Sequence, residues 1–120
     1  MATILIADDS RFQVQLLSKA LIANGFRVIT AMDALQAWTM ALRSAPDAIV
    51  LDINMPGGTG IEVLKKLRMS TKTQHIPVVV ASGNDDRGIE QSTRELGASE
   101  FLHKPVDPDE LCGILHRLAP

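Results

Sequence analysis

The sequence has a single cysteine, no excess of basic residues and no long apolar run, and each absence excludes a class of protein. Cys112 is alone, so no internal disulfide can form and a reducing compartment is expected. The sequence contains twelve lysines and arginines and fourteen acidic residues, whereas nucleic-acid-binding domains usually carry a clear basic excess. No segment approaches the roughly 20 apolar residues that a membrane helix needs. We therefore expect a cytoplasmic protein that binds neither nucleic acid nor membrane.

The length and the hydrophobic content predict one domain, residues 1–120, whose core needs no disulfide or structural metal. Short runs rich in valine and isoleucine alternate with longer stretches of helical period, and we interpret the short runs as strands. They lie at residues 3–7, 27–31, 47–51, 76–81 and 99–102. The third and fourth runs are apolar nearly throughout, as expected for central strands of a parallel sheet.

The stretches between the strands repeat apolar residues at helical spacing. Four stripes stand out: Val14, Leu17 and Leu21; Leu35, Trp38 and Leu42; Ile61, Leu64 and Leu67; and Leu111, Ile114, Leu115 and Leu118. A further helix between Asp85 and Leu96 has few large apolar residues, so we expect it to be held weakly. Thr59 and Asp107 are expected to cap the starts of the third and fifth helices, and Gly25 and Gly97 to end the first and fourth. Five βα repeats predict a doubly wound (βα)5 α/β sandwich of three layers, with helices on both faces of a parallel sheet.

Polar side chains follow four of the five predicted strands at their carboxyl ends, where ligands bind in open α/β sheets. Asp8 and Asp9 follow the first strand, Asp52 the third, Ser82 the fourth and Lys104 the fifth. If the strands lie in the order 2-1-3-4-5, these four strands are neighbours and all five side chains converge on one edge. Each residue alone is typical of a turn, a helix cap or an exposed surface, but their joint placement favours a functional site.

The charge balance of this edge predicts a bound cation. Two carboxylates about 4 Å apart repel by roughly 4 kcal/mol at an effective dielectric of about 20, and one lysine cannot offset three carboxylates. Mg²⁺ prefers oxygen ligands, whereas a site without histidine or cysteine argues against zinc. Bound Mg²⁺ supports phosphoryl transfer, in which a carboxylate can act as the nucleophile and form an aspartyl-phosphate. Lys104 and Ser82 would then hold the other phosphoryl oxygens.

The sequence resembles the receiver domains of response regulators, from two-component signalling, over essentially its whole length. The resemblance rests on Asp8-Asp9-Ser10, Asp52-Ile53-Asn54-Met55-Pro56-Gly57, Ala81-Ser82-Gly83 and Lys104-Pro105. It implies a flavodoxin-like fold with strand order 2-1-3-4-5. It also implies Mg²⁺-dependent phosphoryl transfer from a phosphohistidine of a sensor histidine kinase or histidine phosphotransfer protein. Such a domain is a signalling module that promotes its own phosphorylation and dephosphorylation, and is not an enzyme.

The resemblance assigns roles to residues of the acidic edge. It implies that Asp52 is the phosphoacceptor and that Lys104 pairs with the phosphoryl group. It implies that Asp9, Asp52 and the backbone carbonyl of Asn54 bind Mg²⁺, with Asp8 acting largely through water.

The resemblance also implies a switch. Ser82 matches a residue that moves toward the phosphoryl group, and Phe101 matches an aromatic residue that then turns inward. Phenylalanine lacks the hydroxyl of the tyrosine often found there, so no outward hydrogen bond is possible. The surface of the fourth helix, fifth strand and fifth helix would change for a downstream protein or output domain to read. The peptide bond before Pro105 is expected to be cis.

The sequence leaves three alternatives to a phosphorylated receiver. A pseudo-receiver would serve only as a binding scaffold. A phosphatase of the haloacid-dehalogenase type would need a second acid where Asn54 stands. A nucleotide site would use the glycines at residues 57–60, but Val63 occupies the place of the required small residue. These glycines are instead expected to form a mobile loop beside Asp52. A single-domain regulator and the receiver of a longer regulator are both compatible with the sequence.

Overall fold

The computed structural model describes residues 1–83 and 87–120. The first half of the chain forms β1 (Thr3–Ala7), α1 (Arg11–Ala23), β2 (Arg27–Ala31), α2 (Ala34–Ser44) and β3 (Ala48–Asp52). The second half forms β4 (Asn54–Met55), β5 (Gly58–Thr59), α3 (Gly60–Met69), β6 (Val78–Ser82), α4 (Arg87–Glu95), β7 (Glu100–His103) and α5 (Pro108–Leu118). The predicted fourth and fifth strands are therefore β6 and β7.

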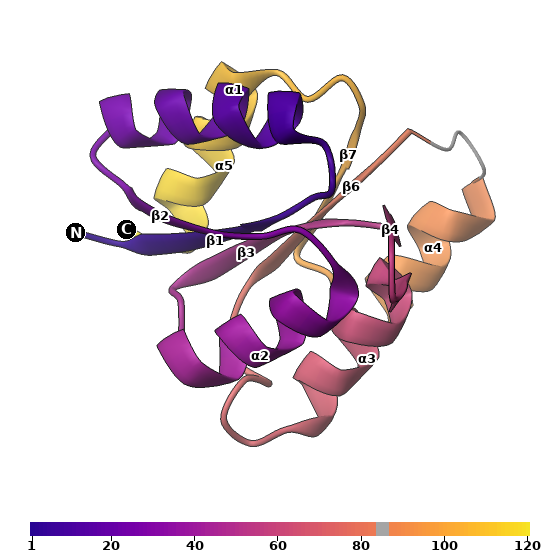
Figure 1. The fold of residues 1–120 in the computed structure, drawn as a ribbon. Helices are drawn as coiled ribbons and strands as arrows, with labels where there is room; N and C mark the ends of the chain where they lie inside the picture. Colours follow the sequence, from indigo (N-terminus) through magenta and orange to yellow (C-terminus); the bar gives the residue numbers. More distant parts are fainter. Residues whose placement is uncertain (84–86) are drawn as a thin grey trace.

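Five parallel strands form the main sheet in the order β2-β1-β3-β6-β7. This is the predicted order 2-1-3-4-5, and it is confirmed. Helices α1 and α5 lie on one face of the sheet, and α2, α3 and α4 lie on the other (Figure 1). Every crossover places the carboxyl ends of the strands at the same edge.

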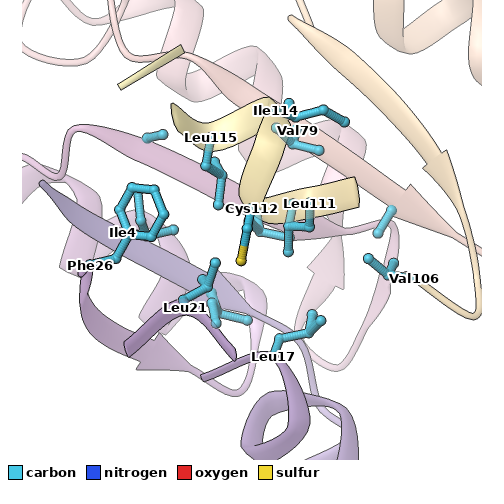
Figure 2. Close-up of a cluster of buried hydrophobic side chains, with 14 of the residues drawn as sticks. Ile4, Leu17, Leu21, Phe26, Val79, Val106, Leu111, Cys112, Ile114 and Leu115 are labelled. Atoms are coloured by element: carbon cyan, nitrogen blue, oxygen red, sulfur yellow. The ribbon is translucent and has the colours of Figure 1, made fainter. Parts of the chain in front are cut away.

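The sheet separates two clusters of buried side chains. Alternate residues of a strand point to opposite faces, so Ile4 belongs to the cluster under α1 and α5, and Leu5 to the cluster under α2, α3 and α4. Figure 2 shows the first cluster, in which side chains of α1 and α5 meet above β1. The labelled residues are Ile4, Leu17, Leu21, Phe26, Val79, Val106, Leu111, Cys112, Ile114 and Leu115.

The sequence signals for helix ends are confirmed. Thr59 accepts a hydrogen bond from the backbone N–H of Glu62 at 3.2 Å, and Asp107 accepts one from Asp109 at 2.9 Å. Gly25 follows α1 with φ of +90°, a left-handed conformation that glycine adopts without strain. These caps fix where α3 and α5 leave the edge that carries the acidic residues.

The predicted stripe on α2, residues 35, 38 and 42, is wrong by one position. The helix buries Ala34, Ala37 and Ala41, whereas Leu35 is 66% exposed. Trp38 is only partly buried at the margin of the cluster. Alanine has no side chain beyond Cβ, so α2 packs close to the sheet and its larger residues lie at the side.

The segment after Asp52 is more regular than predicted. The glycines of residues 57–60 were expected to form a mobile loop, but β4 and β5 pair as a short antiparallel hairpin and Gly60 begins α3. Its turn is tied to α2, because the N–H of Ala34 donates to the carbonyl of Pro56 at 3.1 Å. The hairpin therefore links the start of α2 to the residues that follow β3.

The weakly apolar fourth helix exists as α4, but its predicted start at Asp85 lies outside the described residues. Its end at Gly97 is confirmed, with φ of +94°. Within residues 1–83 and 87–120, no helix is both long enough and apolar enough to cross a membrane.

Candidate functional site

Three carboxylates meet at the carboxyl ends of β1 and β3. Asp8 and Asp9 follow β1, Asp52 is the last residue of β3, and the two strands are neighbours in parallel register. One oxygen of each carboxylate lies within 4.8 Å of the others. Asp8 and Asp52 are each 4% exposed, whereas Asp9 is open to solvent. The predicted convergence of these three side chains is confirmed.

Lys104, the residue after β7, brings a positive charge to the three carboxylates. Its Nζ lies 3.0 Å from Oδ2 of Asp8 and 3.2 Å from Oδ1 of Asp52. Two carboxylates therefore share one ammonium group, and Asp9 adds a third negative charge. The site retains an excess of negative charge that a divalent cation can neutralise.

Backbone hydrogen bonds orient the two buried carboxylates. Asp8 accepts from the N–H of Ser10 at 2.9 Å, and Ser10 is itself the N-cap of α1. Asp52 accepts from the N–H of Asn54 at 3.3 Å. Each carboxylate is thus held by the turn that follows its own strand, which places both side chains before any ligand arrives.

The protonation equilibria reflect burial and crowding. Burial raises the pKa of Asp52 above its usual value, and the charge of Asp8 raises it further; Lys104 offsets only part of this. Burial alone would lower the pKa of Lys104, but its hydrogen bonds and charge interactions with Asp8 and Asp52 outweigh burial and raise it. An ionised Asp52 is therefore less favourable in the folded protein than in water unless further positive charge is present.

This shift predicts how stability depends on pH without metal. A carboxyl whose pKa is higher in the folded chain stabilises the fold fully below its unfolded pKa, about 4. That contribution is lost as pH rises through the folded pKa. In EDTA, the melting temperature of an Asp52→Asn variant minus that of wild type should therefore grow as pH rises from about 4 to 7. A difference in melting temperature that stays constant or shrinks over this pH range would contradict a raised pKa of Asp52.

Gly60 is part of the site as the first residue of α3, and not as part of the loop predicted for residues 57–60. A Cβ at this position would lie 2.2 Å from the carbonyl oxygen of Asp52 and 2.9 Å from Cα of Ile53. The N–H of Gly60 donates to the carbonyl of Ile53 at 2.7 Å. The start of α3 therefore sits directly on the backbone of Asp52. A glycine in the first turn of a helix, where it lowers helix propensity, is the signal that could have identified this contact.

Ser82 lies beside the acidic residues at the end of β6. Asp52 is in register with Ala81 on the neighbouring strand, so Ser82 is one residue further toward the edge. Its side chain is buried, and its carbonyl accepts from the N–H of Lys104 at 2.9 Å. The structure therefore places Ser82 between the strands that carry Asp52 and Lys104.

Phe101 lies on β7 and is buried against the cluster under α2, α3 and α4. The ring of His103, two residues further on the same side of the strand, meets it edge-on with centroids 5.1 Å apart. The Lys104–Pro105 peptide bond is cis, as the resemblance implied.

Comparison with known proteins agrees with this geometry. The model of the family described as "response regulator receiver domain" matches residues 4–116. The chain belongs to this family. The receiver is 46% identical to Response regulator PleD of Caulobacter vibrioides over 106 residues, which are 88% of the chain but 23% of PleD.

Solved structures give the same fold. The receiver superposes on the chemotaxis response regulator CheY4 of Vibrio cholerae with a TM-score of 0.91 and 33% identity, covering 98% of each chain. It also superposes on the Mn²⁺-bound form of response regulator Rcp1 with a TM-score of 0.85, covering 99% of this chain and 95% of that one. The identity of 24% to Rcp1 shows the fold alone.

The acidic pocket with its Lys104 ion pairs is therefore the pocket of a receiver domain. A receiver is a signalling module and not an enzyme, so the haloacid-dehalogenase interpretation of the sequence does not apply. Membership of the family also implies a cognate histidine kinase.

Proposed function

We propose that Asp52 accepts a phosphoryl group from a phosphohistidine of a sensor kinase or of a histidine phosphotransfer protein. The observation that carries this proposal is a buried carboxylate with a raised pKa, Asp52, which shares the ammonium group of Lys104 with the neighbouring carboxylate of Asp8. Such a group is poorly neutralised by the protein alone and is held in one orientation by the N–H of Asn54. Both features suit a nucleophile that becomes covalently modified.

The donor set fits a hard divalent cation, and we infer Mg²⁺. Asp8, Asp9 and Asp52 offer only oxygen atoms, and the backbone carbonyl of Asn54 is a further proposed ligand. The Mn²⁺-bound form of Rcp1, a protein of the same fold, is consistent with such a site. When bound, the cation would supply positive charge that offsets the three carboxylates and the oxygens of the phosphoryl group.

The residues of the chain then have distinct tasks. An oxygen of Asp52 forms a bond to phosphorus as the bond between phosphorus and the donor imidazole nitrogen breaks, and the imidazole leaves. Lys104 pairs with a phosphoryl oxygen, and the hydroxyl of Ser82 donates to another. Ser82 and Phe101 next adjust, and the surface of α4, β7 and α5 changes for a downstream partner to read.

Intact-mass measurement after incubation with acetyl phosphate and Mg²⁺ tests this function. We expect one added phosphoryl group on wild type, and none on Asp52→Ala or on wild type in EDTA. If wild type takes up no phosphoryl group, and its spectra do not respond to beryllofluoride, the pseudo-receiver interpretation is the correct one.

Helix α1 offers a surface on which a protein donor can dock. It starts two residues after Asp9, and Phe12 in its first turn is 75% exposed. Leu16, one turn further along, is also exposed. Replacing both by alanine should slow transfer from a phosphorylated protein donor roughly 10- to 100-fold, because a buried aromatic anchor often contributes about 2 kcal/mol to an interface. Phosphorylation by acetyl phosphate should be unchanged.

Ile22 provides the matched control for this prediction. It is also an exposed apolar residue of α1, at 60%, but it lies about 15 Å along the helix from Phe12. Ile22→Ala should transfer at the wild-type rate. Equal slowing in both variants, or slowing with acetyl phosphate as well, would argue against docking at the first turns of α1.

A further inference from the structure

Arg68, in the last turn of α3, links this helix to two other segments through their backbone carbonyls. Its Nε and Nη2 donate to the carbonyl of Gly97 at 3.2 and 2.8 Å. Its Nη1 donates to the carbonyls of Gln74 and Ile76 at 3.2 and 2.8 Å. In the described part of the chain these hydrogen bonds reach only uncharged oxygens. The guanidinium therefore acts as a link between α3, the segment before β6 and the turn after α4.

Two sets of hydrogen bonds fix the C-terminal end of α4, one within its own backbone and one from Arg68. The N–H of Gly97 donates to Arg94 and that of Ala98 donates to Thr93, which closes the helix with paired bonds typical of a glycine C′. Arg68 donates hydrogen bonds to the carbonyl of Gly97, at the C-terminal end of the helix, where a positive charge is favourable. A Cβ at Gly97 would lie 2.8 Å from Nε of Arg68, so the contact is close.

The opposite end of α4 is held differently. Ile89 is partly buried, and Glu90 pairs with Arg94 and His103 at 3.3 and 3.8 Å. The side chains of these pairs are about half exposed, and exposed pairs contribute little to stability. Because α4 follows β6 and precedes the parallel strand β7, its N-terminal end lies toward the carboxyl edge of the sheet, where Ser82 ends β6, and Gly97 lies toward the amino edge, where β7 begins.

We propose that Arg68 is a positioning residue for α4, which fixes the C-terminal end of this helix and confines the response to phosphorylation to its N-terminal half. The proposal deepens the proposed function and rests on it for the signal at Asp52. The helix then moves as a lever about Gly97, and its mobile end is the one toward the carboxyl edge of the sheet. The charge of Arg68 has no part in the pocket and serves only to hold the far end.

The first test follows backbone amide resonances of wild type on addition of beryllofluoride and Mg²⁺. We expect large shifts at residues 88–91 and small ones at 96–98. The second test compares amide hydrogen exchange without ligand in Arg68→Met and wild type. Exchange at 96–98 should rise about tenfold or more relative to that of β3, because hydrogen bonds to a charged group are lost there. In Arg68→Met, the beryllofluoride shifts should extend to 96–98.

Two further variants make the test specific. Arg117→Met removes another guanidinium, which pairs with Glu100 at 3.6 Å on the surface, and should behave as wild type. Arg68→Lys keeps the charge but not the planar fork, so it should show an intermediate rise in exchange and also serves if Arg68→Met does not fold.

The proposal is overturned if wild type shifts as much at 96–98 as at 88–91, or if neither Arg68 variant raises exchange at the end of α4. Failure of the proposed function is seen separately. In that case wild type takes up no phosphoryl group and shows no beryllofluoride shifts, while exchange in the unliganded Arg68 variants still decides whether the anchor exists.

Discussion

Replacing Lys104 by methionine is expected to separate phosphorylation from the conformational response while leaving the fold intact. Methionine keeps an apolar stem but removes the ammonium group that joins Asp8 to Asp52. A phosphoryl group on Asp52 then lacks its charged partner, and a charge-assisted hydrogen bond contributes about 1.5–3 kcal/mol. The equilibrium between the two conformations should therefore shift roughly 10- to 100-fold less on phosphorylation.

The measurement combines intact mass with amide resonances of α4 and β7, so that the spectral change is expressed per phosphorylated molecule. Lys65→Met, which removes an exposed lysine of α3, is the control and should respond as wild type. Metal-free Lys104→Met should lose only about 1–2 kcal/mol of stability, because Lys104 is partly exposed and its two partners keep their backbone hydrogen bonds. A full spectral response in this variant would refute the role of Lys104.

Adding one methyl group at Gly60 is expected to damage the site far more than the same change at Gly113, the glycine in the middle of α5. The added Cβ would overlap the carbonyl oxygen of Asp52, so either α3 or this carbonyl would have to move. Such overpacking destabilises by about 1–3 kcal/mol. A displacement of Asp52 by about 1 Å can slow a reaction roughly 100-fold, so phosphoryl uptake from acetyl phosphate should fall by one to two orders of magnitude.

Gly113 offers the matched comparison, because a Cβ there would meet nothing within 4 Å. Gly113→Ala, in the middle of α5, should stabilise the protein by about 0.5–1 kcal/mol and leave uptake unchanged. The free energies of unfolding and the uptake rates of both variants, measured well below their melting temperatures, separate the two effects. Normal uptake by Gly60→Ala would show that Asp52 does not depend on this contact.

Much of the fold was predictable because the strongest signals in the sequence are local. The apolar runs of β1 and β3 and the caps at Thr59 and Asp107 depend on neighbouring residues, so they locate elements to within one or two positions. The strand order and the meeting of Asp8, Asp9 and Asp52 followed from the crossover rules and from the resemblance.

The remaining features depend on distances between segments that no local pattern encodes. The face of α2 was misplaced because periodicity gives large residues such as Leu35 more weight than Ala34, although the small residue is the one that fits against the sheet. The contacts of Gly60 and Arg68 were not predicted for a different reason. Each contact is made with a backbone carbonyl of another segment, Asp52 for Gly60 and Gly97 for Arg68, and the sequence around a residue does not specify which distant backbone atom it meets.

The division of the core by the sheet has a consequence for how such a protein can diversify. The cluster under α1 and α5 and the cluster under α2, α3 and α4 share only strand backbone, so substitutions in one have little steric effect on the other. One layer can remain a stable foundation while the other accumulates changes that suit a different target. A donor on α1 and a target on α4 would also occupy opposite layers (Figure 1), so neither must leave before the other arrives.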